Sequence, residues 1–289
     1  MVRWRQRRGE GLDQIEDRRG IPGGAATVGG GLGLGGLVIL LVLQFLGGNL
    51  GGGGGTAINP DVFLEPLAPA GGQTGPAPSA GEDLVDFVGF VVGDVQDTWA
   101  DIFSRSGRPY EPTKLVLFEG TTQSGCGFAS EESGPFYCPL DKKVYLDLTF
   151  FRDLETRFGA PGDFAGAYVI AHEFGHHVQN ITGIAEDVRT RQQSDPGAAN
   201  ELSIRLELQA DCLAGIWANS AFAQGDLEAG DIDEGLKAAA AVGDDRIQSQ
   251  SGGVVNPESW THGSSEQRTQ WFRTGYESGD PSACDTFAA

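Results

Sequence analysis

Basic side chains are scarce in this sequence, where 20 Lys and Arg oppose 40 Asp and Glu and the formal net charge is −20 at pH 7. Residues 1–19 hold six Arg and four acids, so removing their net +2 leaves about −22 on the rest of the chain. So acidic a body repels phosphates, which argues against nucleic acid as a partner. The balance predicts a soluble, self-repelling surface instead.

Charged residues are absent from 21–49, and the second half of this stretch, 37–46, is strongly apolar. The 22 residues of 25–46 suffice to cross about 30 Å of hydrocarbon as one helix, although many glycines weaken its first half. No small-x-small cleavage site follows closely, so a cleaved signal peptide is the less favoured alternative. We expect 1–24 to stay in the cytoplasm because of its Arg, and everything after the span to lie outside a single-pass cell-membrane anchor.

Glycines four residues apart in this span, Gly29/Gly33 and Gly31/Gly35, are a weak signal for a homodimer in the membrane. The following residues 47–81 are rich in Gly, Pro and Ala and offer no continuous apolar face. This composition predicts a flexible linker ahead of the folded domain.

Cysteine is also rare, with four in the chain and no C-x-x-C pair, which argues against a cysteine-based zinc site. Cys126 and Cys138 are separated by twelve positions between turn-forming residues, and we expect them to close a loop as a disulfide. Cys284 would then pair with Cys212 as the only remaining thiol. An oxidising environment outside the membrane favours both bonds.

Of the four histidines, three lie in the sequence HEFGHH that begins at residue 172. Apolar residues at helical spacing precede it and a glycine follows at 183, which predicts a helix. His172 and His176 then stand on one face and can bind one Zn²⁺ ion, while Glu173 can take a proton from a metal-bound water. The alternative is a pair of solvent-exposed histidines on an amphipathic helix.

A third ligand is expected from the apolar helical segment 200–217, where Glu207 and Asp211 are four residues apart and face one way. We expect Glu207 to bind the zinc and Asp211 to accept the free ring N–H of a ligand histidine. The competing possibilities are a solvated acidic face, or Glu201 as the ligand.

The fourth histidine, His262, is a candidate donor to a tetrahedral oxyanion. A structural role in its loop is favoured over this, because Ser264 and Gln267 form a capping box that begins the next helix. The charged run 244–246 is interpreted as a helix cap or a surface pair.

Four sequences in order between residues 83 and 284 resemble the neutral zinc metallopeptidase family of bacterial membrane-anchored proteins, which belongs with the gluzincin-type metallopeptidases. They are HEFGHHVQ from residue 172, ELQADCLAG from 207, GDDRIQ from 243 and THGSSEQR from 261. The resemblance implies His172, His176 and Glu207 as ligands of one zinc ion and Glu173 as the catalytic base. It also implies that an edge strand at 144–148 binds substrate backbone by strand addition.

The expected fold for 82–289 is α+β. A long helix covers about 84–103, a buried strand covers 115–118, and a further strand covers 144–148. The helix with the HExxH motif follows, and then the one with Glu207. Together with the resemblance this describes a zincin-like, thermolysin-type domain. The expected function is hydrolysis of extracytoplasmic peptides or proteins. A zinc-stabilised but inactive binding module, or a hydrolase of another amide or ester, would use the same residues.

Overall fold

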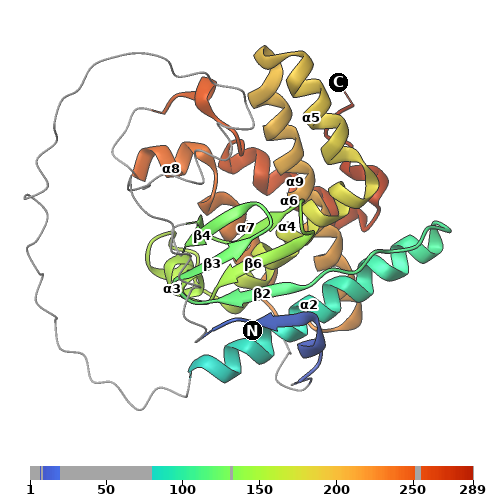
Figure 1. The fold of residues 1–289 in the computed structure, drawn as a ribbon, viewed down its shortest axis with the longest axis vertical. Coiled ribbons are helices and arrows are strands. Elements are labelled where there is room, and N and C mark those ends of the chain that lie inside the picture. The colour runs from blue at the N-terminus through green and yellow to red at the C-terminus, as the bar shows by residue number, and fades with distance from the viewer. Residues whose placement is uncertain (1–6, 8, 20–79, 131–132, 251–254, 289) are drawn as a thin grey trace, which may run out of the picture.

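The computed structural model describes residues 7, 9–19, 80–130, 133–250 and 255–288. The predicted membrane span at 25–46 lies outside these residues, as does nearly all of the predicted linker at 47–81. Within the described part of the chain, no helix is long and apolar enough to cross a membrane. The folded part mixes helices with small sheets, as the α+β prediction requires (Figure 1).

The main sheet has four strands in the order β1-β2-β6-β5. β1 (Ile15–Asp17), β2 (Leu115–Phe118) and β6 (Lys143–Asp147) run parallel, and β5 (Phe136–Cys138) is antiparallel to β6. β2 is apolar and buried along its whole length, as expected for a strand covered on both faces. A separate antiparallel hairpin joins β3 (Thr121–Ser124) to β4 (Gly127–Ser130).

The prediction that the strand at 144–148 is an edge strand was wrong. β6 lies between β2 and β5, so backbone groups on both of its sides already pair with neighbouring strands. The edges of this sheet are β1 and β5. That β1 forms one edge of the sheet was not expected, because residues 1–24 were predicted to be a cytoplasmic segment separate from the folded domain.

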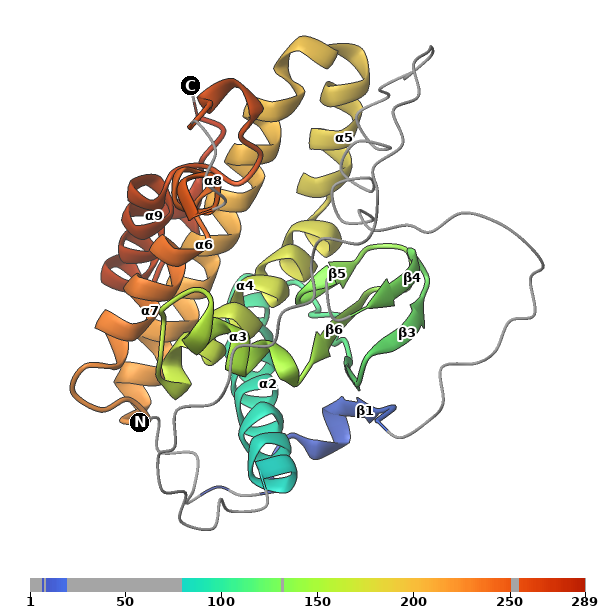
Figure 2. The ribbon, with the colours of Figure 1, turned by 90° about the vertical axis from the view of Figure 1, so that its left-hand side faces the viewer.

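The helices surround α4, which carries the HExxH motif. Figure 2 shows α4 between the helices α6 and α7 on one side and β5 and β6 on the other, and these elements contact it. The helices are α2 (Ala80–Arg105), α3 (Thr149–Thr156), α4 (Asp163–Thr182), α5 (Ile184–Ser194), α6 (Ala199–Gln224), α7 (Asp231–Ala241), α8 (Asp244–Gln250) and α9 (Ser265–Ser278). Short 3₁₀ turns are η2 (Leu12–Gln14), η4 (Pro196–Ala198), η5 (Pro257–Ser259) and η6 (Pro281–Cys284).

The sequence of α4 explains its central position. Every residue from Phe164 to Gly175 is buried, and an α-helix that is covered all round belongs to the interior of a domain. The helix ends at Gly183, whose φ of 88° is the left-handed conformation that glycine adopts readily. The helix that carries the motif is therefore held firmly by its surroundings.

α6 and α9 approach each other backbone to backbone at two glycines. A Cβ on Gly275 would lie 1.9 Å from the Cys212 carbonyl oxygen, and one on Gly215 would lie 2.1 Å from the Phe272 carbonyl oxygen. Any side chain at either position would force the helices apart. The contact brings the first turn of α9, with Arg268, against the middle of α6.

Both predicted disulfides are present. Cys126–Cys138 joins the β3–β4 hairpin to the end of β5, and Cys212–Cys284 joins α6 to η6 near the C-terminus. The second bond closes a separation of 72 residues against 12 for the first. Because a longer closed loop restricts the unfolded chain more, the second bond should contribute more stability.

Removing the disulfides one at a time tests this order. We expect the double substitution C212A/C284A to lower the free energy of unfolding by about 4 kcal/mol and C126A/C138A to lower it by about 3 kcal/mol. Urea unfolding without reductant, followed by circular dichroism, measures both values, and each variant is the matched control of the other. Equal stability of the C212A/C284A variant and the parent would contradict the expectation.

Candidate metal centre

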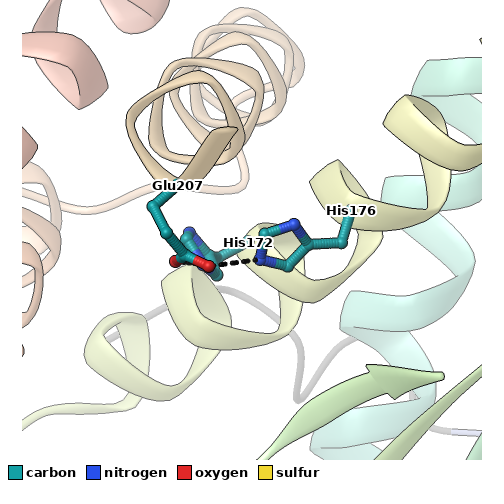
Figure 3. A group of neighbouring side chains, drawn as sticks. All are labelled: His172, His176 and Glu207. Carbon is teal, nitrogen blue, oxygen red and sulfur yellow. Dashed lines mark hydrogen bonds and ion pairs between the residues drawn. The ribbon is translucent and has the colours of Figure 1, made fainter. Parts of the chain in front are cut away.

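The three expected ligands meet between α4 and α6. His172 and His176 project from successive turns of α4, and Glu207 reaches toward them from α6 (Figure 3). His172 Nε2 lies 3.2 Å from Glu207 Oε2, and His176 Nε2 lies 3.4 Å from Glu207 Oε1. One potential ligand atom from each of the three residues lies within 4.8 Å of those of the other two, so a single ion can contact all three.

The second nitrogen of each imidazole is already engaged. His172 Nδ1 lies 2.9 Å from Asp211 Oδ1, and His176 Nδ1 lies 2.9 Å from the Gln179 side-chain oxygen. With Nδ1–H donating to these oxygens, the Nε2 lone pairs face Glu207 and are available to a metal. Two neutral imidazoles and a carboxylate, each imidazole oriented by an acceptor, are a ligand set that suits catalytic zinc. The residues present therefore fit the metal that the sequence implies.

Asp211 is fully buried and links three helices. Arg268 on α9 donates from Nε to Oδ2 at 2.8 Å and from Nη2 to Oδ1 at 2.9 Å, and the Tyr168 hydroxyl on α4 donates to Oδ1. Burial alone would raise the pKa of Asp211, but Arg268 and His172 outweigh it and hold the pKa below its ordinary value. An ionised Asp211 is the strong acceptor that fixes the orientation of His172.

Glu173 lies in the same region, is 8% exposed and lines the adjoining cavity. Its burial raises the pKa of the carboxyl above the ordinary value, while the two imidazoles oppose this. A carboxylate with a raised pKa beside a metal site is suited to accept a proton and return it.

The ligands form a charged cluster in the metal-free protein. Burial would lower the pKa of His172, but the Asp211 and Glu207 carboxylates raise it to about 10. The pKa of His176 is raised by Glu207 in the same way, against its own burial. Burial alone would raise the pKa of Glu207, but the two imidazoles outweigh it and hold this pKa well below its usual range.

A cavity of about 510 Å³ opens at the ligands. His172, Glu173, His176 and Glu207 form its polar end. Most of the remaining lining is apolar, with aromatic side chains supplied by β4, β5 and α3. These are Phe128, Phe136, Tyr137 and Phe150. The site therefore combines a small charged end with a large apolar wall, as substrate pockets commonly do.

His262 also lines this cavity. Its Nδ1 lies 3.1 Å from Asp244 Oδ1, while Asp244 Oδ2 accepts the backbone N–H groups of Thr261, His262 and Gly263. Burial would lower the pKa of His262, but Asp244 and Glu207 raise it. Asp244 begins α8, which is consistent with the helix-cap interpretation of 244–246, but it is 8% exposed and organises the loop that presents His262, so it is not part of a surface pair.

The third histidine of the motif and the rival ligand Glu201 both have other partners. His177 is fully buried, its Nε2 donates to the Glu111 carbonyl oxygen at 2.6 Å, and its Nδ1 lies 3.1 Å from the Tyr137 hydroxyl. Glu201 is exposed and forms an ion pair with Arg205. Neither belongs to the group formed by the two motif histidines and Glu207.

Sequence reasoning missed Arg268 and Tyr168. Tyr168 lies one helical turn before His172, a spacing that could have identified it as a neighbour. Arg268 ends the fourth family-like sequence but is 57 residues beyond Asp211, so only the close contact of α6 with α9 reveals its role.

Zinc binding should release protons. Since the pKa of His172 is raised to about 10 in the metal-free protein, this imidazole is protonated at pH 7 and must lose its proton to bind metal. Zinc affinity should therefore fall about tenfold per pH unit for each proton displaced as the pH decreases from 8.5 to 6.5. Calorimetric titration in buffers of different ionisation enthalpy measures the number released. Affinity that does not vary with pH would contradict this.

Asp211 should contribute to metal affinity without touching the metal. Asp211→Asn keeps the size of the side chain but removes the charge that orients His172 and pairs with Arg268, so we expect zinc affinity to fall about 10- to 100-fold. Competition with a chromogenic chelator measures it. The matched control is Asp233→Asn at an exposed site on α7, which should leave the affinity unchanged. Equal affinities in the two variants would exclude the proposed role of Asp211.

Comparison with known proteins agrees with this geometry. Residues 2–287 match the family model described as "Putative neutral zinc metallopeptidase". The chain is 44% identical over 291 residues to the uncharacterized protein YpfJ of Escherichia coli K12, covering 99% of each chain. It is 48% identical over 206 residues to the uncharacterized protein Rv2575 of Mycobacterium tuberculosis H37Rv, covering 68% of each. No solved structure is significantly similar. The match over nearly the whole chain means that this protein belongs to the neutral zinc metallopeptidase family.

Proposed function

We propose that this protein is a zinc-dependent peptidase with a zincin-like active site. The observation that carries the proposal is the convergence of His172, His176 and Glu207 on one point of a cavity that Glu173 also lines. A metal held only for stability would need no adjacent acid and no cavity. Here a general base lies within the same buried cluster, at the polar end of a space large enough for a peptide side chain.

His172, His176 and Glu207 would hold the zinc, which would supply a Lewis acid able to polarise a scissile carbonyl and to acidify water. Glu173 would accept a proton from the attacking water and return one to the leaving amine. The Asp211 carboxylate keeps His172 oriented while the charge at the site changes. His262, which lines the same cavity and is held by Asp244, is the residue we assign to the developing oxyanion as a hydrogen-bond donor.

The apolar wall of the cavity supports peptides with large hydrophobic side chains as substrates. The side chains of Phe128, Phe136 and Phe150 line this wall and carry no charge that could pair with a charged group of a substrate. Binding there would gain from burial of apolar surface, on the order of 25 cal/mol per Å².

The two disulfides support an extracytoplasmic setting for the domain, because such bonds persist in oxidising compartments. Substrates would accordingly be peptides or proteins outside the cytoplasm. A binding module that keeps zinc without turnover is the alternative, and a hydrolase of other amides or esters is a further one. Both would use the same three ligands.

The substitution Glu173→Gln separates catalysis from metal binding. It removes the base but no ligand, so we expect peptide cleavage to fall at least about 100-fold while one zinc per chain is retained. Cleavage of a peptide library is measured by mass spectrometry and zinc by atomic emission, with His176→Gln as the control that should lose both. If neither the parent nor the Glu173 variant cleaves any peptide although both hold zinc, the binding module is favoured.

A further inference from the structure

The N-terminal segment Gly9–Arg19 is built into the folded domain. β1 pairs with β2 in parallel register, with Ile15 opposite Leu115 and Asp17 opposite Leu117. The Arg18 N–H continues the ladder by donating to the Leu117 carbonyl oxygen at 2.8 Å. β1 therefore occupies one edge of the main sheet.

Side chains reinforce this contact. Lys143 Nζ lies 2.6 Å from Glu16, Arg18 Nη1 donates to the Gln123 carbonyl oxygen at 2.9 Å, and Lys114 donates to the Asp13 carbonyl oxygen. The partners come from β6, β3 and the start of β2. Three separate elements of the domain thus hold the segment.

The backbone around Gly11 packs directly onto α2. A Cβ on Gly11 would lie 2.0 Å from the Gly89 carbonyl oxygen, and Gly93 is in contact as well. Gly11 also has a φ of 70°, a conformation that disfavours a side chain. The segment lies on the surface of the domain, but this close backbone contact fixes its position against α2.

The chain leaves this segment and re-enters the domain at one place. Arg19 Nη1 lies 3.7 Å from the position that a Cβ of Gly81 would occupy, near the beginning of α2. Arg19 and Gly81, which lie on either side of the apolar stretch 25–46 in the sequence, are therefore neighbours in the structure. A helix that crosses a bilayer once separates its two flanks by about 30 Å of hydrocarbon.

We propose that Gly9–Arg19 and the metal-binding domain fold in one compartment, on the same side of the membrane. Strand pairing needs backbones about 5 Å apart, so a cytoplasmic β1 cannot pair with an extracytoplasmic β2. Pairing of β1 from one copy of the protein with β2 of a second copy does not remove this conflict. If both copies had the same membrane orientation, their β1 and β2 would still lie on opposite sides. The stretch 25–46 is long enough for one crossing, and the Gly- and Pro-rich 47–79 holds no second apolar run for a return.

This topology does not depend on catalysis, and it replaces the cytoplasmic placement expected for residues 1–24. It also gives the Arg-rich leader a structural role, because β1 forms the edge strand that pairs with β2. The leader would then not act as a signal for membrane orientation.

Single introduced cysteines test the proposal in the full-length chain. All four native cysteines are in disulfides, so a new thiol is the only one available. Asp13→Cys reports on the leader and Glu155→Cys on the domain, both at exposed positions. Spheroplasts expressing each variant are treated with a membrane-impermeant maleimide before and after lysis, and labelling after lysis controls for local access.

We expect both thiols to be labelled before lysis and to equal extents relative to the lysed sample. Labelling of Glu155→Cys alone, with Asp13→Cys labelled only after lysis, would overturn the proposal. Labelling of both only after lysis would support the shared compartment but place it in the cytoplasm, which would count against the proposed extracytoplasmic function. The two proposals can therefore fail separately.

A zero-length carbodiimide crosslink tests the docked strand directly in native membranes. This reagent joins a carboxylate and an amine as an amide with loss of water, and Glu16 and Lys143 are placed for it. We expect a peptide containing both residues by mass spectrometry, and its loss in the matched variant Glu16→Gln. Failure to detect the link in the parent, when another close pair such as Lys142–Glu111 is linked, would contradict docking.

Discussion

The buried carboxylate of Asp211 is the interaction on which the metal centre depends. A charge with no exposure is tolerated only when its partners replace water, and here those partners are Arg268, Tyr168 and His172. They come from α9 and α4, while Asp211 itself lies on α6. The same network that neutralises the charge therefore aligns three helices and sets the orientation of the first zinc ligand.

The local part of the site could be predicted from the sequence because it depends on helical spacing. His172 and His176 are one turn apart, and Glu207 and Asp211 are one turn apart, so each pair shares a face wherever its helix lies. The structure brings these two faces together. Arg268 could not be found this way, since its position depends on the packing of α9 against α6, which no local pattern encodes.

The sheet was harder to predict for a similar reason. Residues 115–118 could be predicted as a buried strand because all four are apolar. The order of strands, however, depends on partners far apart in the sequence, and β6 was therefore predicted wrongly as an edge strand. β1 has three residues and no apolar alternation, so nothing in its composition distinguishes it from the charged leader around it. The charge pattern of 1–24 predicted a topology, but it gave no sign that residues 15–17 pair with β2.

The close contact between α6 and α9 has a consequence for how sequence change affects the metal. Gly215 and Gly275 touch neither zinc ligands nor the cavity, yet their lack of a side chain lets the two backbones meet. One added methyl group at either position would move α9 outward and carry Arg268 away from Asp211. Inherited variation at these glycines would therefore be expected to change the orientation of His172, although neither glycine is a candidate metal ligand.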